Sequence, residues 1–273
     1  MAFALDQLPV PFRMQPGLTR LPDDATHLSP LAPGHPLFAQ KLAVVRAGQS
    51  RHVIPGFDIA PALAAIRRQA LAQAIAGPLD AGTPLELAFE EDFALLDGDS
   101  GTLPWLCVCT PSHWAPEDKL GHSLAAVHAP VADSARLQAS AHALVALATG
   151  GGHWEREVWG LSPSPRHDQH PRRHPPTEWP PVHDLQAFAA GCWLRTERQT
   201  FFPVGGGTRQ AVFTIRVQLH PLVRAVDTRA KAQRLHDSLA SMSEAVLAYK
   251  GLASAHPHLL QWLLMRCAQL PAQ

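Results

Sequence analysis

The stretch that decides the fold is Cys192-Trp-Leu-Arg-Thr-Glu-Arg-Gln-Thr-Phe-Phe-Pro-Val204, together with the later run Ala211-Val-Phe-Thr-Ile-Arg-Val-Gln-Leu219. Both runs are rich in β-branched and aromatic residues, which favour extended backbone. The segment that joins them begins with Gly205-Gly-Gly207, a composition typical of a turn. The pattern therefore predicts an antiparallel hairpin.

The first strand of this hairpin carries charge in its middle. Arg195, Glu197 and Gln199 alternate along the strand, so their side chains leave the same face of the pleat. Thr196 and Arg198 leave the other face. Because buried charge is costly unless it is paired, charge in a central strand indicates a functional site. A solvated face with a cross-strand ion pair is the alternative.

Composition excludes several classes of function. The 273 residues include 23 Lys and Arg and 23 Asp and Glu, so no excess charge steers the chain towards nucleic acid or an acidic membrane. No apolar run has the length of a membrane span, and the N-terminus lacks the pattern of a signal peptide. The four cysteines are too few for a disulfide framework. We therefore expect a soluble, cytoplasmic protein.

Hydrophobic periodicity places the other elements. Further strands are expected at 91–96, 103–110 and 154–161, and helices at 37–46, 61–76, 133–148, 228–239, 241–250 and 256–268. A crossover helix that ends before Pro130 carries Leu124, Val127 and His128 on one face. Gly251 is expected to cap the helix before it.

This order is two strands, a helical crossover and three strands. It predicts an α+β fold with a PAS-like, five-stranded antiparallel sheet covered by its connecting helices. The expected division is an N-terminal arm and helix at 1–84, a core at 85–225, and C-terminal helices at 226–273.

Two segments are rich in proline. Residues 1–37 are expected to form an irregular arm over the surface. Residues 162–183 also contain His167, His170, His174 and His183, which are candidate ligands for an adventitious metal ion. The prolines and arginines between them favour a mobile, solvated loop instead.

Four groups of residues together resemble one known family. They are Glu91-Asp92-Phe93; Pro111-Ser-x-Trp114 with Lys119-Leu-Gly121 and Val127-His-Ala-Pro-Val131; Leu194-Arg-Thr-Glu-Arg-Gln-Thr200 with Val212-Phe-Thr-Ile-Arg216; and Tyr249-Lys-Gly251. In order and spacing they resemble the haem-bearing subunit of haem-dependent oxidative N-demethylases.

The resemblance implies a PAS-like core that binds haem b. It also implies oxidation of a small secondary amine, such as dimethylamine, by dioxygen and electrons from a separate flavin/iron–sulfur reductase. The chain departs from the family pattern at Glu157-Val-Trp159, where the family has an Asn-Trp pair. Two other functions are compatible with the residues: a haem-binding sensor without turnover, and a haem-free scaffold that binds a partner.

An axial ligand for haem must come from a rigid element. His128 is the first candidate because it matches the family's histidine and lies on the crossover helix. His122 is the second candidate, and Cys107 or Cys109 would supply a thiolate. The alternative for His128 is a core histidine without a functional role, and for the cysteines it is simple packing in the sheet.

Other residues are candidates for holding the cofactor and substrate. Arg195, Arg198 and Arg216 are natural partners for haem propionates, because guanidinium binds carboxylate in a bidentate fork. Trp114 is expected to line the haem slot or the core. Glu197 is placed to accept a proton from a bound ammonium, or to form an ion pair with an arginine of its own strand. If Glu197 is catalytic, Arg195 is expected to act with it, because both side chains leave the same face of the strand.

Overall fold

The computed structural model describes residues 3–14, 17–75, 82–129, 132 and 138–271. Its centre is one seven-stranded sheet in the order β1-β5-β6-β7-β3-β4-β2, with every neighbouring pair antiparallel. The strands are β1 (Thr19–Leu21), β2 (Arg51–Val53), β3 (Asp92–Asp97), β4 (Trp105–Cys107), β5 (His153–Ser162), β6 (Trp193–Pro203) and β7 (Gln210–Pro221).

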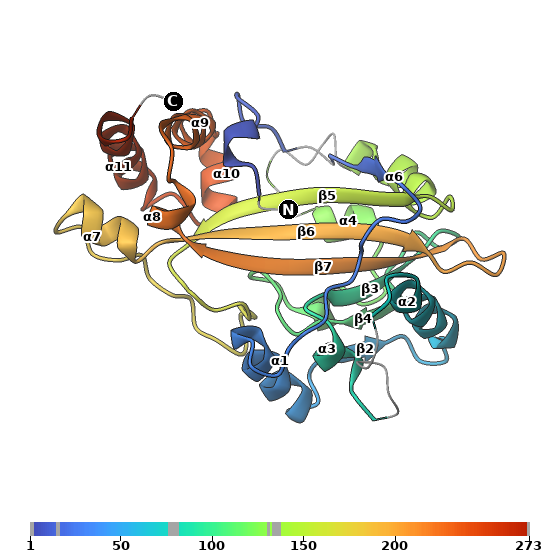
Figure 1. Ribbon diagram of the computed structural model, residues 1–273. Coiled ribbons are helices and arrows are strands. Elements are labelled where there is room, and N and C mark those ends of the chain that lie inside the picture. The colour runs from blue at the N-terminus through green and yellow to red at the C-terminus, as the bar shows by residue number, and fades with distance from the viewer. Residues whose placement is uncertain (1–2, 15–16, 76–81, 130–131, 133–137, 272–273) are drawn as a thin grey trace.

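The predicted hairpin is confirmed as β6 and β7, which run side by side through the middle of the sheet (Figure 1). In the turn between them Gly205, Gly206 and Gly207 have φ angles of 80°, 66° and 78°. These left-handed angles are strained for residues with a Cβ, which explains the glycine run. The register pairs Glu197 with Val217. Glu197 therefore shares a face with Arg195, as the alternation predicted.

The expectation of five strands is wrong, because the sheet has seven. The five expected strands are present and contiguous, in the order β5-β6-β7-β3-β4. The additional strands are β1, which pairs with β5, and β2, which pairs with β4. Each strand has three residues with little burial. Only backbone pairing defines these strands, because their sequences show no hydrophobic alternation. The N-terminal arm therefore contributes an element to the sheet.

The described residues contain ten α-helices. They are α1 (Pro36–Arg46), α2 (Ala60–Ala72), α3 (Leu85–Ala88), α4 (Leu124–His128), α6 (Ala141–Ala148), α7 (Leu185–Ala190), α8 (Leu222–Ala225), α9 (Arg229–Ala240), α10 (Glu244–Tyr249) and α11 (His256–Gln269). Of the helix expected at 133–148, residues 133–137 lie outside the described part. No helix among the described residues is long and apolar enough to cross a membrane.

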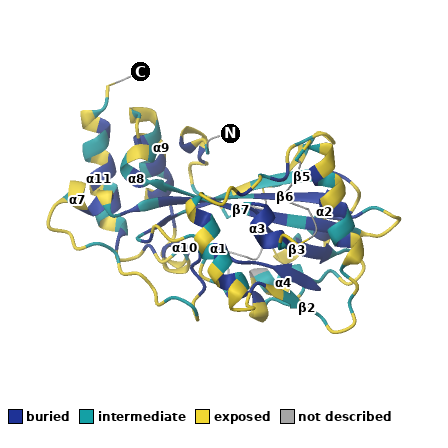
Figure 2. Ribbon diagram, turned by 60° about the horizontal axis from the view of Figure 1, so that its bottom comes forward, coloured by how far each residue is buried: buried dark blue, intermediate teal, exposed yellow. Residues whose placement is uncertain are grey.

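The two faces of the sheet are covered by different helices. Phe93, Trp105 and Phe202 pack with residues of α2 and α3. On the other face Ala94 and Leu106 pack with residues of α4 and α6. Burial of a large apolar side chain stabilises a fold by about 1.5–3 kcal/mol, so both layers are strongly held. Figure 2 shows the result, with buried strands inside and exposed residues on the outer helices and loops.

A third core lies at one end of the sheet. There α7, α8, α9 and α11 gather beyond the ends of β6 and β7 (Figure 1). Their buried side chains, among them Leu235, Leu259 and Trp262, pack with Trp159 of β5 and Leu194 of β6. Gly251 follows α10 with a φ of 66°, which confirms it as a helix cap.

The segment 162–183 is irregular, as predicted, and residues 175–178 and 181–183 are exposed, but the expectation that it is solvated is wrong for its first part. Asp168, Gln169 and His170 are buried. The Asp168 carboxylate accepts hydrogen bonds from Nε and Nη2 of Arg173, each 2.9 Å long. His170 Nε2 lies 3.1 Å from a Glu117 carboxylate oxygen. These pairs provide partners for the Asp168 and His170 side chains inside the fold, so the first part of the segment packs against the rest of the molecule.

The N-terminal arm is locked to the sheet by a buried histidine. His27 Nδ1 lies 2.8 Å from Thr200 Oγ1, and His27 Nε2 lies 2.7 Å from His153 Nδ1. Thr200 Oγ1 lies 2.7 Å from Thr214 Oγ1 on the next strand. Burial, with the nearby His153 and Arg198, lowers the pKa of His27 to about 3. The arm therefore packs on the sheet through an uncharged imidazole.

This linkage predicts acid sensitivity. An unfolded histidine titrates near pH 6.5, so between pH 6.5 and 3 the unfolded chain binds a proton that folded His27 does not. The free energy of unfolding should therefore fall as the pH falls through this window. In His27→Gln this contribution disappears, so the loss of stability between pH 7 and pH 5 should be about 2 kcal/mol smaller than in the wild type.

Urea unfolding at the two pH values measures this difference. His183→Gln is the matched control, because His183 is exposed. Equal losses of stability in His27→Gln and in the wild type would contradict the assignment.

Candidate functional site

The Glu197 carboxylate lies in the middle of the face that α4 covers and is held there by hydrogen bonds. Ser112 Oγ donates a short hydrogen bond to Glu197 Oε1, and Gln199 Nε2 donates to Glu197 Oε2 at 2.7 Å. Arg195 Nε donates to Ser112 Oγ at 2.7 Å. Because the hydroxyl accepts from Arg195, its own proton is directed to Glu197. The Glu197 side chain is thus fixed at both oxygens while it stays partly exposed.

Arg195 donates four hydrogen bonds to other residues of the chain. Its guanidinium also donates to the carbonyls of Arg166 (3.3 Å), Thr110 (3.1 Å) and His167 (2.9 Å). Burial lowers the pKa of Arg195 to about 10, although Glu197, Asp92 and Asp168 oppose this effect. Arg195 therefore ties the 162–183 segment and the loop after β4 to β6.

Two residues at the end of α10 approach the same carboxylate. Lys250 Nζ donates to the Trp159 carbonyl at 2.8 Å and lies 5.4 Å from the ring centroids of both Phe12 and Trp159. Burial lowers the pKa of Lys250 to about 8, against the attraction of Glu197. Burial also raises the pKa of Tyr249, with a further contribution from Glu197. The end of α10 is therefore within the electrostatic influence of Glu197, while the Trp159 side chain that Lys250 contacts leaves the opposite face of the sheet.

A further cation comes from β5. Arg156 pairs with Gln199 in the sheet register, so its side chain leaves the face that carries Glu197. Burial lowers the pKa of Arg156, and the charge of Glu197 opposes the shift. Arg156 was not predicted, because the register between β5 and β6 joins segments that are distant in sequence.

Open space lies beside these groups. Gly160 pairs with Arg195, and a Cβ atom added to Gly160 would meet no heavy atom within 4 Å. On the same face Trp114, Leu124 and Val127 pack against the sheet but are only partly buried. The face thus carries a carboxylate, cations and partly buried apolar side chains, with room for further atoms at Gly160. Haem requires apolar contacts and cations for its propionates, and the residue types on this face are compatible with that requirement.

The axial-ligand candidates are placed differently. His128 ends α4, and its side chain lies outside the part that the structure describes. His122 is exposed in the turn before α4. Cys107 and Cys109 are buried in the fold, and burial raises the pKa of both thiols. The choice of His128 stays a prediction.

Two predicted propionate anchors lie on the opposite face of the sheet. Arg198 forms an ion pair with Glu155, and Arg216 Nε donates to Glu90 Oε2 at 2.8 Å. Their register positions alternate with those of Glu197 and Val217, which places them away from the open space. Among the described residues, no group of three or more His, Cys, Asp or Glu side chains is arranged to hold a metal ion.

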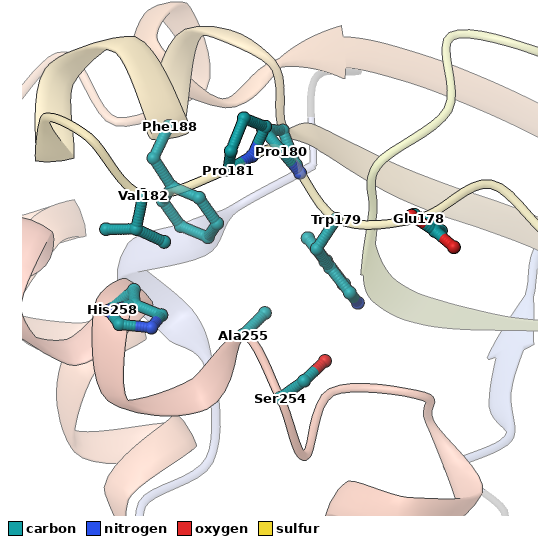
Figure 3. A pocket seen from close by; sticks show the side chains of 9 residues that line it. All are labelled: Glu178, Trp179, Pro180, Pro181, Val182, Phe188, Ser254, Ala255 and His258. Carbon is teal, nitrogen blue, oxygen red and sulfur yellow. The ribbon is translucent and has the colours of Figure 1, made fainter.

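Two cavities lie outside this site. The larger, about 410 Å³, is lined by Trp179, Phe188 and His258 between the 178–182 segment and the start of α11 (Figure 3). The other, about 380 Å³, is lined by Gln40 and by arginines of the 162–183 segment. Neither is lined by Glu197 or Arg156. We place the candidate site at the fixed carboxylate, because neither cavity joins such a group to apolar walls.

The role of Arg195 gives a stability prediction. Arg195→Lys should lower the free energy of unfolding by about 2–4 kcal/mol, since an ammonium cannot reproduce the guanidinium's several directed bonds to Ser112 and the carbonyls. Arg209→Lys is the control, because its ion pair with Asp99 is exposed and should change stability little. Denaturant unfolding of both variants makes the comparison. Equal stability of Arg195→Lys and the wild type would contradict the assignment.

Comparison with known proteins shows the family of the chain. The sequence matches no curated protein. A family model described as haem-dependent oxidative N-demethylase, alpha subunit-like, matches residues 69–260. The matched region contains Arg156, Glu197 and Lys250 and extends from α2 into α11. The chain belongs to the haem-dependent oxidative N-demethylase alpha subunit-like family.

Proposed function

We propose that the chain is the haem-binding subunit of an oxygenase that removes an N-methyl group from a small secondary amine. The observation that carries this proposal is Glu197, fixed at both oxygens beside open space and apolar walls on one face of the sheet. Family membership supports haem dependence. In this proposal the inner strands β5-β6-β7-β3-β4 are a PAS-like sheet to which β1 and β2 have been added.

The proposed haem is haem b, with His128 as its axial ligand. Trp114, Leu124 and Val127 would supply apolar contacts, since they pack on this face and are only partly buried. We assign Arg195 no role as a propionate anchor, because it already donates four hydrogen bonds to Ser112 and to backbone carbonyls. When bound, haem would supply the activation of dioxygen.

Glu197 would bind and deprotonate the substrate. A secondary amine arrives as an ammonium ion, and a carboxylate is its natural partner. Each Glu197 oxygen accepts one hydrogen bond, from Ser112 or from Gln199, which leaves lone pairs for the N–H groups of an ammonium. Proton transfer to Glu197 frees the nitrogen lone pair and so favours oxidation of the adjacent carbon.

The overall reaction requires an electron donor. Dimethylamine, dioxygen, two electrons and two protons give methylamine, formaldehyde and water. We propose that a separate flavin/iron–sulfur reductase supplies the electrons, because the sequence has no motif for either group. The description of the family as alpha subunit-like supports a partner subunit.

Glu197→Gln tests the proposed catalytic step. The variant should bind haem as the wild type does, because the amide keeps the size of the side chain. Its rate of formaldehyde release from dimethylamine should fall by roughly 10²-fold or more, since it cannot act as a base. Glu157→Gln is the control on the neighbouring strand, because Glu157 is exposed and its register position alternates with that of Val158, the partner of Glu197.

The assay uses protein purified with haem, a chemical reductant and dioxygen, with the Soret band as the measure of haem binding. Haem binding without formaldehyde from any small amine would contradict turnover and favour a sensor. A protein that binds no haem would contradict the proposed function and leave the scaffold alternative. An unchanged rate of formaldehyde release in Glu197→Gln would contradict the proposed role of Glu197 as a base.

A further inference from the structure

Arg156 differs from the other arginines of the central strands. Arg195 is bonded to Ser112 and to backbone carbonyls, Arg198 is paired with Glu155, and Arg216 is paired with Glu90. Arg156 makes no hydrogen bond or ion pair with any residue that the structure describes. It is nevertheless only partly exposed. A largely shielded cation without a bonded partner is costly, so this position favours an anion.

The neighbouring carboxylate does not fill this role. Glu197 is close enough to influence Arg156 electrostatically, but its bonded partners are Ser112 and Gln199. Lys250 also experiences the charge of Glu197. Arg195 has Asp92 and Asp168 as further acidic neighbours. Glu197 therefore acts on more than one cation, and no carboxylate of the described residues is bonded to Arg156.

The position of Arg156 suits a ligand that occupies the open space. Arg156 stands opposite Gln199, and Gly160, with room above it, is four residues further along the same strand and on the same face. A guanidinium offers parallel N–H donors that match the two oxygens of a carboxylate. The anion and the substrate ammonium would thus meet Arg156 and Glu197 side by side.

We propose that Arg156 binds a carboxylate group of the molecule that occupies the space beside Glu197. This inference rests on the proposed function and deepens it. The carboxylate has two possible sources, a haem propionate or the carboxylate of an N-methylated amino acid substrate. In the second case the amino acid would bind Arg156 through its carboxylate and Glu197 through its ammonium.

Titrations of the apoprotein with haem and with haem dimethyl ester test the first source. If Arg156 binds a propionate, Arg156→Gln weakens haem binding by about 10–100-fold and leaves binding of the ester unchanged, because the ester has no carboxylate. Arg156→Lys should restore part of the affinity for haem. Arg198→Gln is the matched control on the opposite face of the sheet. Circular dichroism and thermal unfolding verify that each variant is folded.

Titrations of the haem-loaded protein with N-methylglycine and with dimethylamine test the second source, with the shift of the Soret band as the readout. If Arg156 binds a substrate carboxylate, Arg156→Gln weakens N-methylglycine binding by about 10-fold or more and leaves dimethylamine and haem binding unchanged.

Unchanged affinities in both sets of titrations with Arg156→Gln would overturn the inference alone. A wild-type protein that binds no haem would contradict the proposed function and this inference together.

Discussion

The structure depends on one buried guanidinium. Arg195 cannot be left without partners in the sheet, and its bonds to Ser112, Thr110, Arg166 and His167 bring two irregular segments onto β6. One of those bonds directs the Ser112 hydroxyl at Glu197. The charge in the middle of this strand therefore divides between a structural role for Arg195 and the functional role that we propose for Glu197. Arg195 organises the surrounding chain, and Glu197 is the group that this organisation presents to the open space.

The alternation of a β-strand separates these roles further. On one face Arg198 forms an ion pair with Glu155, and Arg216 forms one with Glu90. On the other face the cation of Arg156 is left without such a partner among the described residues. Residues one position apart thus belong to different environments, which is why identical side chains on the same pair of strands carry different roles.

Local pattern predicted the elements that hydrophobic periodicity defines: the hairpin, the shared face of Arg195 and Glu197, and most of the helices. It did not predict β1 and β2, because short edge strands are defined by backbone pairing. The 162–183 segment has the composition of a solvated loop, yet Asp168 and its partners Arg173 and His174 allow its first part to be buried. Arg156 was missed as a site residue because only the register of β5 and β6, which is non-local, brings it to the face that carries Glu197.

The central claim is that the face with Glu197 and Gly160 is where haem binds. A leucine at Gly160 would project into the open space, and no atom within 4 Å opposes its Cβ, so the fold should tolerate it. The most direct measurement is haem affinity of Gly160→Leu, with Gly34→Leu as a control, because Gly34 is equally unobstructed. We expect Gly160→Leu to remain folded and to lose haem affinity by at least about 10-fold, and Gly34→Leu to bind haem as the wild type does. Wild-type haem affinity in a folded Gly160→Leu protein would contradict it.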